Sequence, residues 1–118
     1  MRAGRMWQLH RHYGRPGCLL VSRDGGNSIG SDIKTVESLS TNGVLTEVQD
    51  AFITEGGVQC GFCTPGLVVA IEHLLSNNPD PTELEIKEAI SGNICRCTGY
   101  GRIFEAVTTA VTTRKANR

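Results

Sequence analysis

The sequence lacks an excess of either charge, a long apolar run and an apolar segment near its start. Its 118 residues carry 12 basic and 12 acidic side chains, so the net charge gives no argument for a nucleic-acid partner. No stretch approaches the ~18 apolar residues of a membrane span, and Met1–Gly17 has no apolar region typical of a secretory signal. We therefore expect a cytoplasmic chain with no membrane span and no nucleic-acid partner.

The cysteine content argues against a disulfide framework. The chain has five cysteines, an odd number, and four of them form two tight pairs, Cys60-x-x-Cys63 and Cys95-x-Cys97. Closely spaced pairs of this kind favour a metal site in a reducing compartment.

The balanced charge conceals a difference between the start of the chain and the rest. Met1–Arg23 holds five arginines and no acidic residue, whereas residues 24–118 hold seven basic and 12 acidic residues. The same segment contains the only tryptophan and follows neither a strand nor a helix period. Three interpretations stay open: a disordered basic tail, an arm for an anionic surface, and a segment foreign to the rest of the chain.

Residues 44–114 have the pattern of two similar helical halves. Thr46 with Gln49 and Thr82 with Glu85 each form a capping box at the start of a predicted helix, and Gly56-Gly57 ends the first of these. A longer predicted helix follows each cysteine pair, and apolar residues at helical spacing mark the two: Leu67, Val68, Ile71, Leu74 and Leu75, then Ile103, Phe104, Val107, Ala110 and Val111.

The order helix, cysteine loop, helix therefore occurs twice. It predicts a mainly α fold, with four helices in an approximately two-fold symmetric bundle. Upstream, the residues between Asp32 and Leu39 indicate a short extended segment.

Four thiolates suit either tetrahedral zinc or an iron–sulfur cluster. Both cysteine pairs lie in glycine-bearing loops that lead into helix N-termini, where backbone N–H groups and the helix dipole favour negative charge. Zinc ligands are more often separated by two to four residues, so Cys95-x-Cys97 favours the cluster. His73 lies beyond the first loop and is interpreted as a surface residue rather than a ligand.

The segments around the cysteines resemble a known family. Val-Gln-Cys-Gly-Phe-Cys-Thr-Pro-Gly (58–66) and Gly-Asn-Ile-Cys-Arg-Cys-Thr-Gly-Tyr (92–100) closely resemble the iron–sulfur subunit of molybdenum hydroxylases. That family includes xanthine dehydrogenase, aldehyde oxidoreductase and aerobic carbon-monoxide dehydrogenase. The resemblance runs from about Cys18 to Val111.

The resemblance implies one [2Fe–2S] cluster on Cys60, Cys63, Cys95 and Cys97, with Gln59 and Cys97 facing the pterin of a partner subunit. It implies an electron relay with no catalytic residue of its own, from a large molybdopterin subunit toward a second cluster and FAD in a further subunit. Arg96, between two of these cysteines, is interpreted either as a solvated charge or as a partial counter-charge to the cluster.

The N-terminus departs from the family pattern. Family members begin with a ferredoxin domain that uses four cysteines, and here only Cys18 matches, at the fourth position. Met6-Trp7 can only be encoded ATG TGG, which reads as cysteine after a shift of one base, and neighbouring codons allow the missing Cys-x4-Cys spacing. We therefore hypothesise an out-of-frame segment, which resequencing the locus would test.

The predicted organisation is thus a non-family segment at residues 1–17, a ferredoxin-like remnant with its linker at 18–43, and a helical cluster-binding domain at 44–114. Two alternatives remain at this point. One is a helical protein-interaction module that is stabilised by bound zinc. The other is an inactive fragment of an iron–sulfur subunit of this family.

Overall fold

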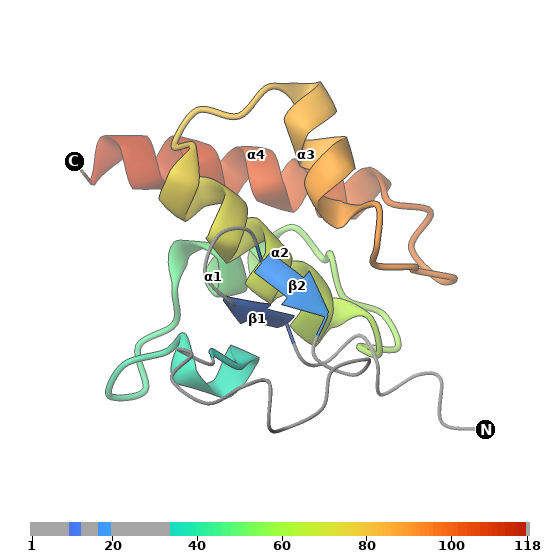
Figure 1. The fold of residues 1–118 in the computed structure, drawn as a ribbon, viewed down its shortest axis with the longest axis horizontal. Coiled ribbons are helices and arrows are strands. Elements are labelled where there is room, and N and C mark those ends of the chain that lie inside the picture. Colours follow the sequence, from blue (N-terminus) through green and yellow to red (C-terminus); the bar gives the residue numbers. More distant parts are fainter. Residues whose placement is uncertain (1–9, 13–16, 20–33, 118) are drawn as a thin grey trace.

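The computed structural model describes residues 10–12, 17–19 and 34–117, with side chains from residue 34 onward. Two short antiparallel strands come first, β1 (His10–His12) and β2 (Gly17–Leu19), with Arg11 opposite Cys18. A 3₁₀ turn, η3 (Val36–Ser38), and four helices follow, α1 (Glu47–Thr54), α2 (Thr64–Asn77), α3 (Glu83–Ile90) and α4 (Gly101–Ala116). The described chain is mainly α-helical, as predicted (Figure 1).

Both predicted capping boxes are present. The Thr46 hydroxyl accepts a hydrogen bond from the Gln49 amide, and the Gln49 side chain accepts one from the Thr46 amide at 2.9 Å. Thr82 and Glu85 repeat this arrangement at the start of α3. Each box satisfies two of the backbone donors that a helix start leaves unpaired, so these helix starts follow from the local sequence.

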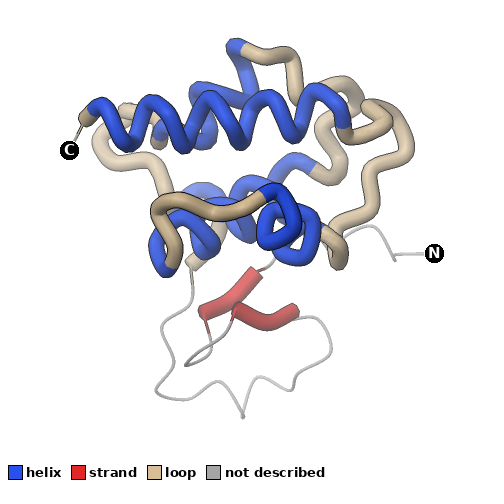
Figure 2. The backbone as a smooth tube through the Cα atoms, turned by 90° about the horizontal axis from the view of Figure 1, so that it is seen from above, coloured by secondary structure: helices blue, strands red, loops and turns tan. Residues whose placement is uncertain are grey.

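The four helices pair across the two halves of the sequence. The short helices α1 and α3 have eight residues each, and the long helices α2 and α4 have 14 and 16. Helix α1 packs against α4, and α2 packs against α3. If the two halves exchanged places, α1 would take the position of α3 and α2 that of α4, and the same two contacts would be present. This arrangement agrees with the predicted approximate two-fold symmetry, and Figure 2 shows the four helices together with the two strands to one side.

The core lies between these helices and extends to the cysteine loops. Its side chains are aliphatic or aromatic, except for two cysteine thiols at one end. The most buried large residues include Phe52, Leu67, Ile71, Leu75 and Ile103. Cys63 and Cys95 belong to the same cluster, at 6% and 8% exposure, so the frame that packs the bundle also holds two of the four paired thiols.

One ion-pair network joins three of the helices. Arg114 of α4 donates hydrogen bonds to Glu47 of α1 at 3.1 Å and to Glu72 of α2 at 2.8 Å. The pKa of Glu47 is lowered, first by a backbone hydrogen bond at the helix start and then by Arg114. Because Glu72 is buried, the guanidinium compensates a charge that would otherwise be costly inside the bundle.

The structure departs from the sequence-based expectations upstream of α1. Residues 36–38 form a 3₁₀ turn where an extended segment was predicted, because the Ser38 hydroxyl bonds both the amide and the carbonyl of Thr35 and closes a tight turn. The strands β1 and β2 were not predicted, since three residues are too few to show a period of two. The remainder of the segments at 1–17 and 18–33 lies outside the described residues. No helix in the described part is both long and apolar enough to cross a membrane.

Candidate metal centre

The first cysteine loop is shaped by glycines at two left-handed positions. Gly56 (φ +67°) ends α1 with a Schellman motif, in which the Gly57 amide bonds the Phe52 carbonyl at 2.9 Å. Gly61 (φ +79°) makes a second turn, and beyond it the Phe62 amide comes near enough to the Cys60 sulfur to lower the pKa of that thiol. Cys63 then occupies the residue before the first turn of α2, so the loop leads into a helix N-terminus as predicted.

The second cysteine loop is held by Tyr100 at the start of α4. Its hydroxyl accepts a hydrogen bond from the Cys95 amide at 2.7 Å and donates one to the Asn93 carbonyl at 3.1 Å. Tyr100 itself adopts a left-handed conformation (φ +68°), which is uncommon for a residue with a side chain. The loop is therefore a defined structure that closes back on itself before α4 begins.

The two loops meet and join their cysteines in two cross-loop pairs. The Cys97 thiol donates to the Cys60 sulfur at 3.3 Å, and Cys63 and Cys95 lie in the same core cluster, near enough for each to shift the pKa of the other. Cys60 and Cys97 are exposed, whereas Cys63 and Cys95 are buried. Both loops lie at the end of the bundle away from the C-terminus of the chain, in light green and orange in Figure 1. The site thus has an exposed pair and a buried pair of sulfurs.

The environment gives the four thiols different pKa values. Burial raises the pKa of Cys63 to about 12, and its contact with Cys95 acts in the same direction. Burial also acts to raise the pKa of Cys95, but hydrogen bonds from the side chain and backbone of Thr98 make the net shift downward. The Phe62 amide, and then Cys97, lower the pKa of Cys60, while the same contact raises that of Cys97. Each pair therefore combines one thiol whose pKa is lowered with one whose pKa is raised.

The pairing of the four sulfurs suits a two-iron cluster. Four-cysteine zinc sites need all four sulfurs around one point, whereas a [2Fe–2S] cluster spreads its four thiolates over two irons. The hydroxyl of Thr64, next to Cys63, is buried without a hydrogen-bond partner, as expected beside a group that supplies acceptor sulfurs.

Other residues that the sequence singled out occupy varied positions. Gln59 and Arg96 are exposed and lie next to the exposed cysteines in sequence. His73 is half-buried on α2, ten residues after Cys63. Cys18 pairs in β2, and its side chain is outside the described part of the chain.

Sequence reasoning missed the polar groups that support the cysteines. Thr98 contacts the Cys95 sulfur with its hydroxyl at 2.9 Å and its amide at 3.4 Å, and the Tyr100 hydroxyl bonds the Cys95 amide. A threonine directly follows the second cysteine in both motifs, at Thr64 and Thr98. That repetition was the one sequence feature that could have indicated a role for Thr98.

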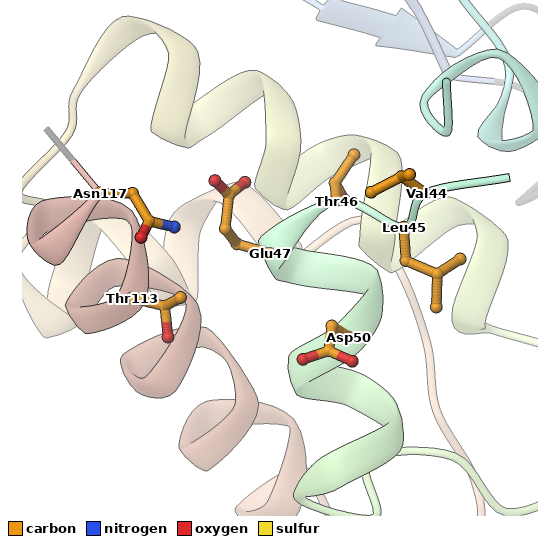
Figure 3. Close-up of a pocket in the computed structure, with 7 residues that line it drawn as sticks. All are labelled: Val44, Leu45, Thr46, Glu47, Asp50, Thr113 and Asn117. Carbon is orange, nitrogen blue, oxygen red and sulfur yellow. The ribbon is translucent and has the colours of Figure 1, made fainter. Parts of the chain in front are cut away.

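A surface pocket lies away from the cysteine loops, between the start of α1 and the end of α4 (Figure 3). Its walls come from the segment before α1 and from the two helices: Val44, Leu45, Thr46, Glu47, Asp50, Thr113 and Asn117. None of these residues belongs to either cysteine motif. The pocket is therefore separate from the candidate metal centre.

Comparisons with known proteins agree with the geometry. The family model described as "[2Fe-2S] binding domain" matches residues 35–108. The chain is 48% identical to the nicotinate dehydrogenase small FeS subunit of Eubacterium barkeri, over 80% of this chain and 57% of that protein. It is 49% identical to the nicotine 6-hydroxylase small subunit of Paenarthrobacter nicotinovorans, over 76% of this chain and 52% of that protein.

A solved structure also matches this chain. The crystal structure of quinoline 2-oxidoreductase from Pseudomonas putida 86 matches with a TM-score of 0.67 and 40% identity, covering 74% of this chain and 55% of that one. The chain thus spans about half the length of the curated relatives it matches.

Proposed function

The chain belongs to the family of [2Fe–2S] binding domains, and from that premise we propose that it carries electrons as part of the iron–sulfur subunit of a molybdenum hydroxylase. The observation that carries the proposal is the meeting of the two cysteine loops at one end of the bundle, where Cys97 lies 3.3 Å from Cys60 and where Cys63 and Cys95 share one buried cluster. Such a relay requires a cluster in a rigid frame near a redox partner, and no nucleophile or general base.

We assign the four cysteines of this site as the ligands of one [2Fe–2S] cluster, which would supply one-electron redox chemistry when bound. Cys63 and Cys95 would anchor it in the core, where the surrounding apolar side chains exclude water. Cys60 and Cys97 would hold its exposed side. The helix start at Cys63 and the amide of Phe62 place N–H groups near negatively charged sulfur, which favours the bound state.

The exposed cysteines, Cys60 and Cys97, support a direction for electron transfer. We propose that Gln59 and Cys97 face the pterin of a large molybdopterin subunit, because both are exposed at the tip of the site. Electrons would enter at this side and pass to a second cluster and then to FAD in a further subunit. The purines, aldehydes or N-heterocycles that such enzymes oxidise would bind to the large subunit, so this chain would not select the substrate.

We also propose an organisation for the whole chain. Residues 44–114 would form the cluster-binding unit, residues 18–43 a remnant of a ferredoxin-like domain with its linker, and residues 1–17 an out-of-frame segment, which the DNA sequence upstream would test. The cytoplasm is the expected compartment, because closely paired cysteines stay reduced there, and cell fractionation checks it.

Iron, acid-labile sulfide and zinc, measured per chain after anaerobic purification, test the proposal. We expect two irons and two sulfides in the full chain, and loss of both when Cys60, Cys63, Cys95 or Cys97 is replaced by serine. Cys18→Ser is the matched control and should keep the full content, since one cysteine outside the two pairs cannot replace a ligand. One zinc without sulfide would instead support a zinc-stapled module, and neither metal would support an inactive fragment.

A further inference from the structure

The sulfur of Cys95 receives two donors from a single residue. The Thr98 hydroxyl lies 2.9 Å from this sulfur and the Thr98 amide lies 3.4 Å from it. The hydroxyl also accepts a hydrogen bond from the Tyr100 amide at 3.2 Å, which leaves its own proton directed to the sulfur. A cysteine that binds iron is a thiolate without a proton, so in that state the hydroxyl has to be the donor.

From this geometry we propose that Thr98 is a positioning residue that raises the reduction potential of the cluster held by the four cysteines. The inference rests on the proposed function, because it requires a cluster at the site. Reduction adds one electron and no proton, so the ligand sulfurs become more negative and accept hydrogen bonds more strongly. Hydrogen bonds to the sulfurs are among the factors that set the potential of such clusters.

Burial makes this contact more effective than an equivalent one at the surface. Cys95 is 8% exposed, and hydrogen bonds to a charged group gain strength where water is excluded. Water can compete at Cys60 and Cys97, which are both exposed. The Cys95 amide is not a further donor to this sulfur, because it donates its hydrogen bond to the Tyr100 hydroxyl at 2.7 Å.

The first loop has no equivalent contact, although its sequence is similar. Thr64 follows Cys63 as Thr98 follows Cys97, but the residue three positions before Thr64 is Gly61, whereas the one before Thr98 is Cys95. The one-residue spacing of the second pair, Cys95-x-Cys97, therefore places a cysteine within reach of the threonine. The spacing that favours a cluster over zinc also creates this hydrogen bond.

The experiment measures the midpoint potential of the cluster in the full chain, by dye-mediated titration with dithionite followed by visible absorption and EPR. The variants are Thr98→Val, Thr98→Ala and Thr98→Ser, with Thr112→Val as the control, because Thr112 has an exposed hydroxyl that bonds only a carbonyl of its own helix. In the valine and alanine variants we expect the potential to fall, with the equilibrium shifting toward the oxidised state by up to about tenfold, or about 59 mV for one electron. Thr98→Ser and Thr112→Val should match the wild type.

Two results would contradict the proposed role of Thr98, and a third would contradict the proposed function. Valine and alanine variants that load fully and keep the wild-type potential overturn the proposal. Failure of both to load, while Thr98→Ser loads normally, also overturns it and assigns Thr98 to cluster assembly. A wild-type chain without iron and sulfide contradicts the proposed function itself, which the metal analysis detects before any potential is measured.

Discussion

Tyr100 connects three parts of the second cysteine loop through one hydroxyl group. That oxygen lies 2.7 Å from the Cys95 amide and 3.1 Å from the Asn93 carbonyl, and Asn93 is 1% exposed. Its ring packs partly buried against the core. A residue that follows the last cysteine of the motif thus fixes the backbone of Cys95, a proposed ligand five positions earlier.

We expect Tyr100→Phe to lower the free energy of unfolding by about 1–3 kcal/mol, because the Cys95 amide loses its acceptor while the ring packing is retained. Urea unfolding of the full metal-free chain, followed by circular dichroism, measures this. Thr108→Val is the control, since it removes an exposed hydroxyl that bonds only its own helix, and it should change stability by less than about 0.5 kcal/mol. Equal stabilities of the two variants would contradict the role assigned to the hydroxyl.

At the residue scale, the sequence was sufficient to find the cysteines but not what supports them. The spacing of Cys60, Cys63, Cys95 and Cys97 is a property of the chain itself and could be compared with known motifs. The contacts of Thr98 and Tyr100 depend on a left-handed turn and on the path of the loop. No periodicity reports such a path.

Helix α1 ends at a position that requires an unusual backbone conformation. Gly56 has φ +67°, and the Schellman hydrogen bonds that follow direct the chain toward Cys60. No atom lies within 4 Å of the position a side-chain carbon would take at Gly56. A substitution there would therefore act through backbone strain and not through a clash.

Gly56→Ala should lower the free energy of unfolding by about 1–2 kcal/mol, the cost of a left-handed conformation for an L-residue. Gly92→Ala is the matched control, because Gly92 is equally uncrowded and has no positive φ, so alanine should leave stability unchanged or raise it slightly. Thermal and urea unfolding of both variants compare them directly. A Gly56→Ala protein as stable as Gly92→Ala would show that this turn is not strained by a side chain.

At the element scale, the helices with strong local signals could be predicted and the short elements could not. Thr46 and Thr82 begin helices through hydrogen bonds to residues three positions away, so the information is contained in four consecutive residues. The 3₁₀ turn at Val36–Ser38 competes with an extended conformation of the same residues, and a serine hydroxyl decides between them. Such a small energy difference is not visible in a hydrophobic pattern.

At the scale of the whole molecule, the pairing of helices depends on contacts between residues far apart in the sequence. Periodicity predicted four apolar faces, but not that α1 packs on α4 and α2 on α3. Arg114 reinforces this arrangement by bridging Glu47 and Glu72, which lie 67 and 42 positions away. The bundle brings both cysteine loops to one end, and that end also carries exposed apolar side chains.

These side chains indicate where a partner would bind. Seven large hydrophobic residues are exposed in the described part of the chain, and three of them belong to the two cysteine loops: Val58 at 40%, Phe62 at 49% and Ile94 at 64%. Apolar groups around exposed Cys60 and Cys97 form a surface that burial against another subunit would stabilise. This is the position expected if electrons enter through the exposed sulfur pair.

We therefore expect Ile94→Glu to weaken association with the proposed large molybdopterin subunit at least tenfold, because a charge would be buried in the proposed interface. Co-expression of both subunits, followed by co-purification and measurement of bound iron, separates loss of association from loss of the cluster, and Val58→Glu gives a second variant farther from a ligand. Leu84→Glu is the control, because Leu84 is as exposed at 65% but lies at the start of α3, outside both loops. If the loop variants keep their iron and co-purify as well as Leu84→Glu, the partner binds elsewhere and the proposed electron entry at Cys60 and Cys97 is wrong.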